Sequence, residues 1–430
     1  MATKIFIELL IIILNNVQST QDLYSSLLVN RLWCKVTIPI LWELILCQDL
    51  DKMNYKKIRK NALFIRTYIS CMDNQSRTLL IQNGFDLSSS PPQATFDYPS
   101  FTHEFRVENF AYFISVYSQK IIGSDQLPGA SRVFKKLETF VSETKNDDLI
   151  GPLYKSLALI CDNILNMDLE FKSESQVQLL EKLISAQKRI ENLSITDNGY
   201  INSNSLLWVI INQKTLKSLR LKSVNFNNFV EKSSPIEQFA SLKELYIEEC
   251  DGLHKSEFLI FASLFTQLSR FHLKNLFYTC PQEFIIKILV TADANLKYIG
   301  LDLYQTIPSD IFSTILNYCT KITELTLYNL SSEQVILIFD NNFNELRRFS
   351  FECVKKLDAN KLLCQMAENV PESLETIRIK MGIFSADSLR KFFEGWCCKG
   401  MGGNKKMTVK RPVLSDEHLK VIEEYGIQLI

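Results

Sequence analysis

A strand-like phrase recurs through about half of the 430-residue chain, and this repetition restricts the folds open to it. The phrase occurs nine times between residues 164 and 380 and carries apolar residues at positions i, i+3 and i+5. Successive copies are separated by 26, 26, 26, 26, 28, 26, 24 and 28 residues, and all 27 anchor positions are apolar. Nine units near one period indicate a repeat architecture in which each unit stacks on its neighbours. The first anchors are Ile164, Ile190, Leu216, Leu242, Leu268, Leu296, Ile322, Leu346 and Leu374.

Helix-like segments separate the strand phrases. The stretches 255–267, 282–294, 308–318 and 331–341 each combine a Pro, Ser or Asp start signal with an apolar face of helical period. A strand and a helix in about 26 residues predict an α/β solenoid. We expect parallel strands along its concave face and helices along its convex face.

The spacing L-x-x-L-x-L resembles that of leucine-rich repeats, whose units run about 20–29 residues. Asparagine is irregular at the position after each strand where such repeats usually carry it. The array is therefore expected to be a divergent member of this class, with uneven curvature. Residues 414–430 are expected to form a capping helix and a short strand, which the end of a solenoid needs.

Strand alternation predicts which side chains line the concave face. The anchors at i+3 and i+5 point into the core, so positions i+2, i+4 and i+6 point to the opposite side. These positions alternate in charge and carry tyrosine and arginine, which are enriched at binding hot spots. The alternative is a solvated sheet face of mixed charge. The candidate target-binding residues are Arg220, Lys222, Glu244, Tyr246, Glu248, Arg270, His272, Lys274, Tyr298, Asp302, Glu324, Tyr328, Arg348, Arg378 and Lys380.

The N-terminal segment predicts three short helices within about 45 residues. An apolar run at 5–14 ends at the pair Asn15-Asn16, and Ser19, Thr20 or Asp22 is suited to cap the next helix. Pro39 is expected to mark a turn or a helix start. A unit of this size buries little of its surface. We therefore expect its tryptophans to remain partly exposed and to bind a partner.

Residues 5–42 resemble an F-box, with an apolar first helix, then DL, then LLVNRLW and a closing PILW. The opening reads KIFIELL where many F-boxes have a Leu-Pro pair. The resemblance implies docking onto the Skp adaptor of a cullin-RING ubiquitin ligase. A helical cap on the repeat array is the alternative. The positions that match the docking motif are Leu27, Leu28, Val29, Trp33, Ile38, Pro39, Leu41 and Trp42.

Composition narrows the functional class. Lys and Arg together number 48, as do Asp and Glu, so the net charge is zero and no basic field for nucleic acid or an anionic membrane is indicated. The chain has eleven cysteines, no CxxC, and four histidines far from any cysteine pair. We interpret the cysteines as reduced core thiols of a cytoplasmic or nuclear protein and expect no metal site. No segment reaches the length of a membrane span.

No catalytic arrangement is indicated. The glycine-rich stretch 399–406 lacks the order of a phosphate-binding loop and is expected to be a turn between a helix and a strand. His272 has no Ser or Cys nucleophile set beside it. We therefore expect no enzymatic activity and no cofactor.

These observations predict three parts: an F-box-like helical module at 1–45, a junction with the first irregular repeats at 46–150, and a leucine-rich-repeat solenoid with a C-terminal cap at 151–430. The resemblance implies a substrate-recognition adaptor of a Skp–cullin–F-box ubiquitin ligase. Its partners would be the Skp adaptor, the cullin scaffold and an unknown target protein. The alternatives are a repeat scaffold without a ligase role, and a secreted leucine-rich-repeat recognition protein if residues 1–20 form a signal peptide.

Overall fold

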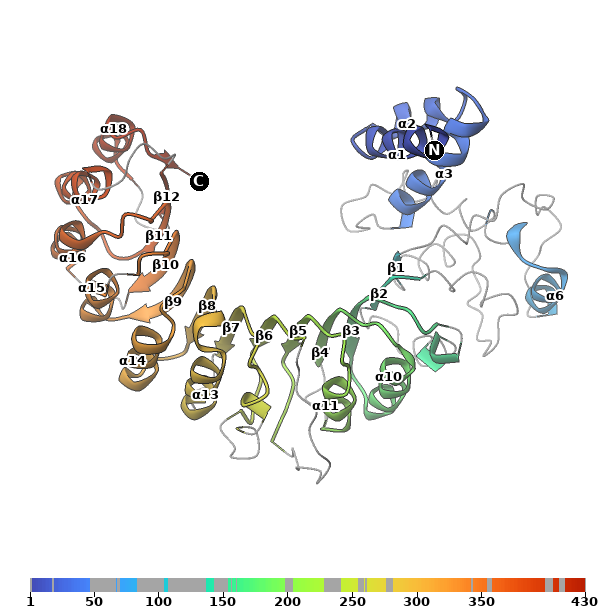
Figure 1. Cartoon of the computed structure of the whole chain (residues 1–430), viewed down its shortest axis with the longest axis horizontal. Coiled ribbons are helices and arrows are strands. Elements are labelled where there is room, and N and C mark those ends of the chain that lie inside the picture. The colour runs from blue at the N-terminus through green and yellow to red at the C-terminus, as the bar shows by residue number, and fades with distance from the viewer. Residues whose placement is uncertain are drawn as a thin grey trace. The chain divides into compact units, whose positions relative to one another are not determined.

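The structure is a computed structural model, and its described residues form two compact units, 1–215 and 216–430. The first of these contains the N-terminal helices and the first strands (Figure 1). Parts of the predicted junction, of the predicted helix at 255–267 and of the glycine-rich stretch lie outside the described residues. The structure describes residues 2–17, 19–46, 67, 70–82, 104–106, 137–142, 154–155, 157–159, 161–197, 204–227, 241–253, 259, 261–275, 281–341, 343–353, 358–398, 405–409 and 414–429.

The N-terminal module consists of three helices, as predicted: α1 (Ala2–Asn15), α2 (Thr20–Ser26) and α3 (Arg31–Leu46). The hydroxyl of Ser19 accepts a hydrogen bond from the backbone N–H of Asp22 and so caps α2. The Asn30 side chain accepts hydrogen bonds from the N–H groups of Leu32 and Trp33, at 2.9 and 3.0 Å, at the start of α3.

Pro39 lies inside α3, so the expected turn or helix start at this residue is wrong. Proline has no N–H, so the helix loses one backbone hydrogen bond there. Packing offsets that loss, because Val36, Ile40 and Leu41, on either side of the proline, pack into one apolar cluster. The centre of this cluster is Leu10, Leu14, Leu23 and Leu41.

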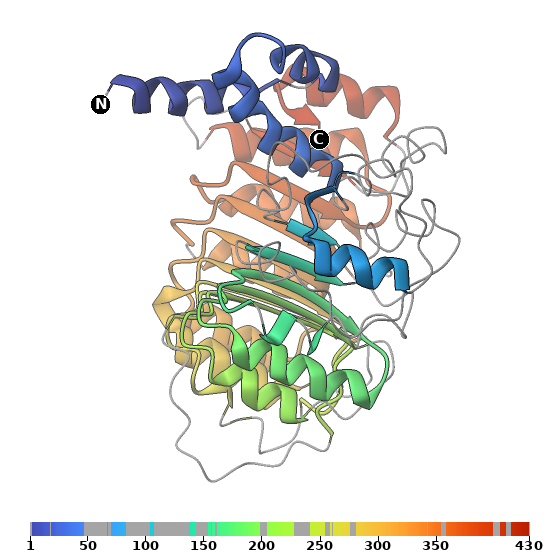
Figure 2. The ribbon, with the colours of Figure 1, turned by 90° about the vertical axis from the view of Figure 1, so that its right-hand side faces the viewer.

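Four parallel strands follow among the residues described in the first unit: β1 (Glu104–Arg106), β2 (Thr139–Ser142), β3 (Asn166–Phe171) and β4 (Asn192–Asp197). Its further helices are α6 (Asn74–Gln82), α10 (Glu174–Ala186) and α11 (Asn204–Ile211), and α10 and α11 lie side by side (Figure 2). The repeat phrase does not reveal β2, because Ser142 occupies its third anchor position. Ser142 is buried, and its hydroxyl lies 2.8 Å from that of Tyr154.

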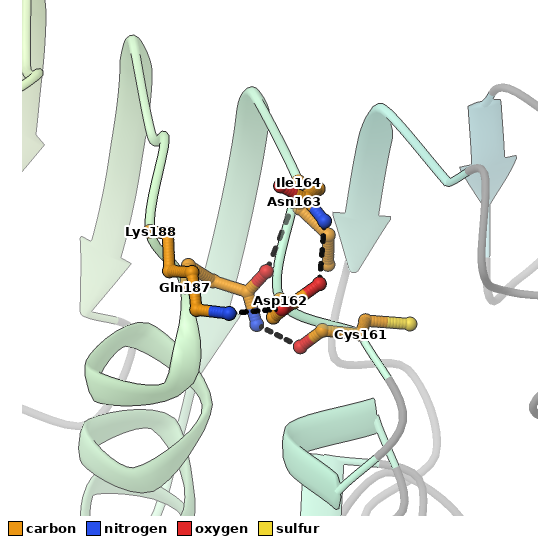
Figure 3. Close-up of polar contacts among 6 residues, drawn as sticks. All are labelled: Cys161, Asp162, Asn163, Ile164, Gln187 and Lys188. Carbon is orange, nitrogen blue, oxygen red and sulfur yellow. Dashed lines mark hydrogen bonds and ion pairs between the residues drawn. The ribbon is translucent and has the colours of Figure 1, made fainter.

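A buried glutamine ties two repeats of this unit together. Figure 3 shows the Gln187 side chain between α10 and the segment before β3. Its carbonyl oxygen accepts from the Ile164 N–H at 3.1 Å, and its amide donates to the carbonyls of Cys161 and Leu183 at 2.8 and 3.1 Å. The Lys188 N–H donates to the carbonyl of Asp162 at 2.9 Å beside it. A polar side chain in the interior is thus fully used for hydrogen bonding.

The described residues of the second unit form nine parallel strands in sequence order, with helices along their outer side (Figure 1). The strands are β5 (Ser218–Lys222), β6 (Glu244–Glu248), β7 (Arg270–Asn275), β8 (Tyr298–Leu303), β9 (Glu324–Leu330), β10 (Arg348–Cys353), β11 (Thr376–Lys380), β12 (Lys406–Val409) and β13 (Gln428–Leu429). The helices are α13 (Gln282–Ala292), α14 (Ser309–Tyr318), α15 (Ser332–Asp340), α16 (Ala359–Met366), α17 (Ala386–Cys398) and α18 (Asp416–Glu424), with 3-10 turns η3 (Asp293–Asn295) and η4 (Ala367–Asn369).

The predicted repeat is confirmed at the level of strands, helices and core. All nine phrases contain a strand, and each of the 27 anchor side chains is at most 3% exposed. Within each unit, the second and third anchors pair with the equivalent anchors of the next strand, as Phe271 does with Ile299 and Phe349 with Ile377. The capping helix and short strand predicted at the C-terminus are α18 and β13.

Short hydroxyl side chains link several repeats to the preceding one. The hydroxyls of Ser269, Thr323 and Ser373 donate to the backbone carbonyls of Lys243, Lys297 and Leu346, at 3.0, 3.1 and 2.8 Å. These hydroxyls lie next to the first anchor, before the strand begins. The carbonyls of Lys243 and Lys297 also accept backbone N–H groups of the next repeat, so the hydroxyls add to these contacts.

Candidate functional site

The fifteen predicted target-binding residues all lie on strands β5–β11, at positions that alternate with the buried anchors. The predicted strand alternation is therefore confirmed, whereas contact of this face with a target stays a prediction. Pairing between strands brings equivalent residues into rows. Glu244 pairs with Arg270, Arg270 with Tyr298, Tyr298 with Glu324, and Glu324 with Arg348.

A stack of cationic and aromatic side chains crosses β5–β8. The guanidinium of Arg220 lies 5.0 Å from the centre of the Tyr246 ring. The rings of Tyr246 and His272 are 6.0 Å apart, and those of His272 and Tyr298 are 6.3 Å apart and nearly parallel. The His272 Nδ1 atom also lies 3.1 Å from the Tyr298 hydroxyl. These contacts fix the ring planes, so the stack forms a preorganised surface.

Arg270 connects this stack to the neighbouring carboxylates. Its guanidinium lies 4.3 Å from the centre of the Tyr298 ring, and its Nε donates to the Tyr246 hydroxyl at 3.3 Å. The same side chain lies 3.7 Å from Glu324, which is also 3.7 Å from Arg348. Arg270 is thus held on several sides by stacking, hydrogen bonding and charge.

Gly300 makes room for the centre of the stack. It pairs with His272 on one side and with Thr326 on the other. A Cβ atom at this position would overlap the His272 ring nitrogen and the Tyr298 hydroxyl. Glycine inside a strand often marks such a close approach.

Burial governs the protonation of the central residues. It lowers the pKa of His272, an effect that Glu248 opposes and that the cations Arg220 and Lys274 reinforce. Burial raises the pKa of Tyr298. His272 is therefore neutral in the folded protein at neutral pH, and it is able both to donate and to accept a hydrogen bond.

Ion pairs lie along the edge of the face where the strands end. Lys274 pairs with Glu249 at 3.2 Å, and Lys380 with Glu352 at 2.6 Å. Burial raises the pKa of Asp302 on β8, against the opposite effect of Lys274. Some of the oppositely charged side chains along this edge therefore form ion pairs with each other.

Glu249 and Lys406 belong to this surface but were not among the predicted residues. Glu249 follows β6 and pairs with Lys274. Lys406 begins β12 and pairs in register with Thr376. The strand expected after the glycine-rich turn is β12, but the nine phrases end before it and Lys406 belongs to the predicted turn, so the phrases do not place it on this face.

The eight predicted docking residues of the N-terminal module differ in exposure. Leu28 is 87% and Val29 is 56% exposed, in the turn between α2 and α3. Three others are partly buried: Leu27, Trp33 and Pro39.

Ile38, Leu41 and Trp42 are buried, and Trp42 is only 6% exposed. The expectation that the tryptophans stay partly exposed is therefore wrong for Trp42. Leu41 belongs to the apolar cluster of the three helices. These three buried side chains therefore contribute to the core.

Four of the described cysteines are buried in the core: Cys161, Cys250, Cys319 and Cys353. Burial raises the pKa of Cys161, Cys319 and Cys353 to about 12, so these thiols are neutral at physiological pH. Within the described ranges, no group of three or more His, Cys, Asp or Glu residues could hold a metal ion. No helix in that part of the chain has the length and apolar character needed to cross a membrane.

Comparison with family models and with curated proteins finds no match to the chain.

Proposed function

We propose that the protein is a substrate-recognition adaptor of a Skp–cullin–F-box ubiquitin ligase. In this proposal the N-terminal module docks onto the Skp adaptor, and the concave face of the repeats binds a target protein. The proposal rests on the F-box resemblance of residues 5–42 together with the repeats that follow.

The observation that carries the proposal is the apolar surface of the N-terminal module. Leu9, Ile12 and Ile13 lie at helical spacing on α1 and are each more than half exposed, while Leu10 and Leu14 form the buried side. A helix on the surface of a soluble protein normally turns a polar face to water. Contiguous exposed apolar side chains mark interaction sites.

The turn between α2 and α3 adds to this surface. Leu28 and Val29 are exposed there, and Tyr24 of α2 is 55% exposed. Leu28 and Val29 belong to the LLV part of the motif. We therefore assign the main docking contacts to Leu28 and Val29, and a supporting role to the buried Ile38, Leu41 and Trp42.

A pull-down with purified Skp adaptor and cullin tests the proposal. It compares the intact chain with a Leu28→Asp/Val29→Asp variant. Exposed positions tolerate polar substitution, so this variant is expected to fold and to lose adaptor binding. The matched control is Leu337→Asp/Ile383→Asp, which places the same charges on exposed apolar residues of the second unit.

Binding by the intact chain and the control, with loss in the module variant, is the expected result. No binding by a well-folded intact chain would refute the ligase role. That outcome would favour a repeat scaffold without ligase function, the alternative that the burial of Ile38, Leu41 and Trp42 supports.

A further inference from the structure

Charge is distributed unevenly over the concave face of the second unit. On β5–β9 its concave positions carry four cations, Arg220, Lys222, Arg270 and Lys274, and four carboxylates, Glu244, Glu248, Asp302 and Glu324. On β10–β12 they carry four cations, Arg348, Arg378, Lys380 and Lys406, and one carboxylate, Glu352. This part of the face therefore has a charge of +3 in a chain whose net charge is zero.

Three of these cations surround one point of the sheet. Thr376 on β11 pairs with Arg348 of β10 on one side and with Lys406 of β12 on the other. Arg378 lies two residues further along β11. With strands about 4.8 Å apart and about 3.3 Å per residue, the three Cα atoms lie about 8–10 Å from one another. Their side chains can therefore converge on a single small anionic group.

The surroundings leave this point open. The residues between the cations are short: Thr376, and Ser350, which pairs with Arg378. Arg348 is 64% exposed, and its contact with Glu324 is long, at 3.7 Å. Within the described part of the chain, neither Arg378 nor Lys406 forms an ion pair. The carboxylate of Glu352 is taken up by Lys380.

We propose that the concave face of β10–β12 binds an acidic peptide segment of a target protein, with Arg348, Arg378 and Lys406 contacting its carboxylates. Charge complementarity favours an anionic partner, because an excess of cations, with Arg378 and Lys406 outside the ion pairs of the described residues, steers and holds carboxylates. The arginine side chains supply the planar donor pairs that match a carboxylate. The hydroxyls of Ser350 and Thr376 offer further donors. The inference specifies the target half of the proposed function and rests on it.

Fluorescence anisotropy on the full chain tests this site without any adaptor present. The probe is a fluorescein-labelled (Glu-Ser)4 peptide, with (Gln-Ser)4 and a (Gln-Ser)4 peptide carrying one phosphoserine as separate arms. An Arg378→Gln/Lys406→Gln variant is compared with a Lys361→Gln/Lys391→Gln variant. The second pair removes the same charge from exposed positions on α16 and α17.

We expect (Glu-Ser)4 to bind the unaltered chain, with an affinity that falls when salt rises from about 50 to about 200 mM. The face variant should bind at least about tenfold more weakly, and the helix variant within about twofold. Equal loss in both variants, equal binding of (Gln-Ser)4, or binding of the phosphoserine peptide alone would each overturn the proposal. Thermal unfolding of both variants verifies their folding. Failure here leaves adaptor docking unaffected, because that assay uses the other end of the chain.

Discussion

Replacing Gln187 by methionine should destabilise the first unit strongly. Methionine has a similar length and is apolar, so it fills the space but provides no hydrogen bonds. The buried Ile164 N–H loses its acceptor, which costs about 1–3 kcal/mol, and the carbonyls of Cys161 and Leu183 each lose a donor, at about 0.5–1.5 kcal/mol. The expected loss in the free energy of unfolding is about 3 kcal/mol.

Gln213 provides a matched comparison one repeat further along the chain. Its amide donates one hydrogen bond, at 3.0 Å, to the Ile184 carbonyl, which also accepts from the Gln187 N–H. Gln213→Met therefore leaves no backbone group without a partner. It should cost about 1 kcal/mol, the net value of one ordinary hydrogen bond.

Urea unfolding followed by circular dichroism measures both losses, and hydrogen exchange of the Ile164 amide shows where the structure opens. We expect faster exchange at Ile164 in Gln187→Met and little change in Gln213→Met. Equal destabilisation by the two substitutions, or an Ile164 amide that remains protected in Gln187→Met, would refute the reasoning.

Three further predictions concern the second unit. Ser223 has a left-handed backbone at φ 56°, so Ser223→Asn should raise the free energy of unfolding by about 0.5–1 kcal/mol in urea titration, and a decrease would contradict this. Gly300→Ala should lower it by about 1–3 kcal/mol, because the new methyl group overlaps His272 and Tyr298, whereas Ser350→Ala should change it little. The pKa of His272 is lowered on folding, so the unfolded chain takes up this proton first as the pH falls below about 6.5, and stability decreases. In His272→Gln the decrease in stability between about pH 7 and about pH 5 should be smaller, and an identical pH profile would exclude His272 as its source.

The sequence predicts the repeats well because their core depends on a short local pattern. Positions i, i+3 and i+5 carry the information, and every copy found this way is a buried strand in the structure. The pattern fails where a polar side chain finds its own partner. Ser142 replaces an apolar anchor in β2, and the Tyr154 hydroxyl, twelve residues further along, satisfies it. Such a pair is visible only after folding.

The sequence predicts the N-terminal module less completely, for two physical reasons. Helix α3 continues through Pro39, because packing on either side compensates for one missing hydrogen bond. Trp42 is buried although three short helices alone bury little, and a local pattern contains no measure of that burial.

The candidate site depends on register, which the phrase predicts only in part. Alternation along each strand places His272 on the concave face, and equal phrasing of neighbouring strands places it opposite Tyr246 and Gly300. The sequence does not predict that the rings of His272 and Tyr298 stack, or that Gly300 makes the space for them. Both depend on side-chain geometry. The nine phrases do not predict the position of Lys406 on this face, because they end at residue 380, before β12.

The in-register pairing of β5–β8 sets the spacing of side chains across the concave face. Adjacent strands are about 4.8 Å apart, and an extended peptide advances about 3.3 Å per residue, so two repeats span nearly the length of three residues. Lys222, Glu248, Lys274 and Asp302 occupy one row across β5–β8 and alternate in sign from strand to strand. The row therefore repeats its charge every two strands. An extended segment that lies along this row, at right angles to the strands, would match it with a charge pattern that repeats every three residues. This periodicity can be sought in the sequences of binding partners.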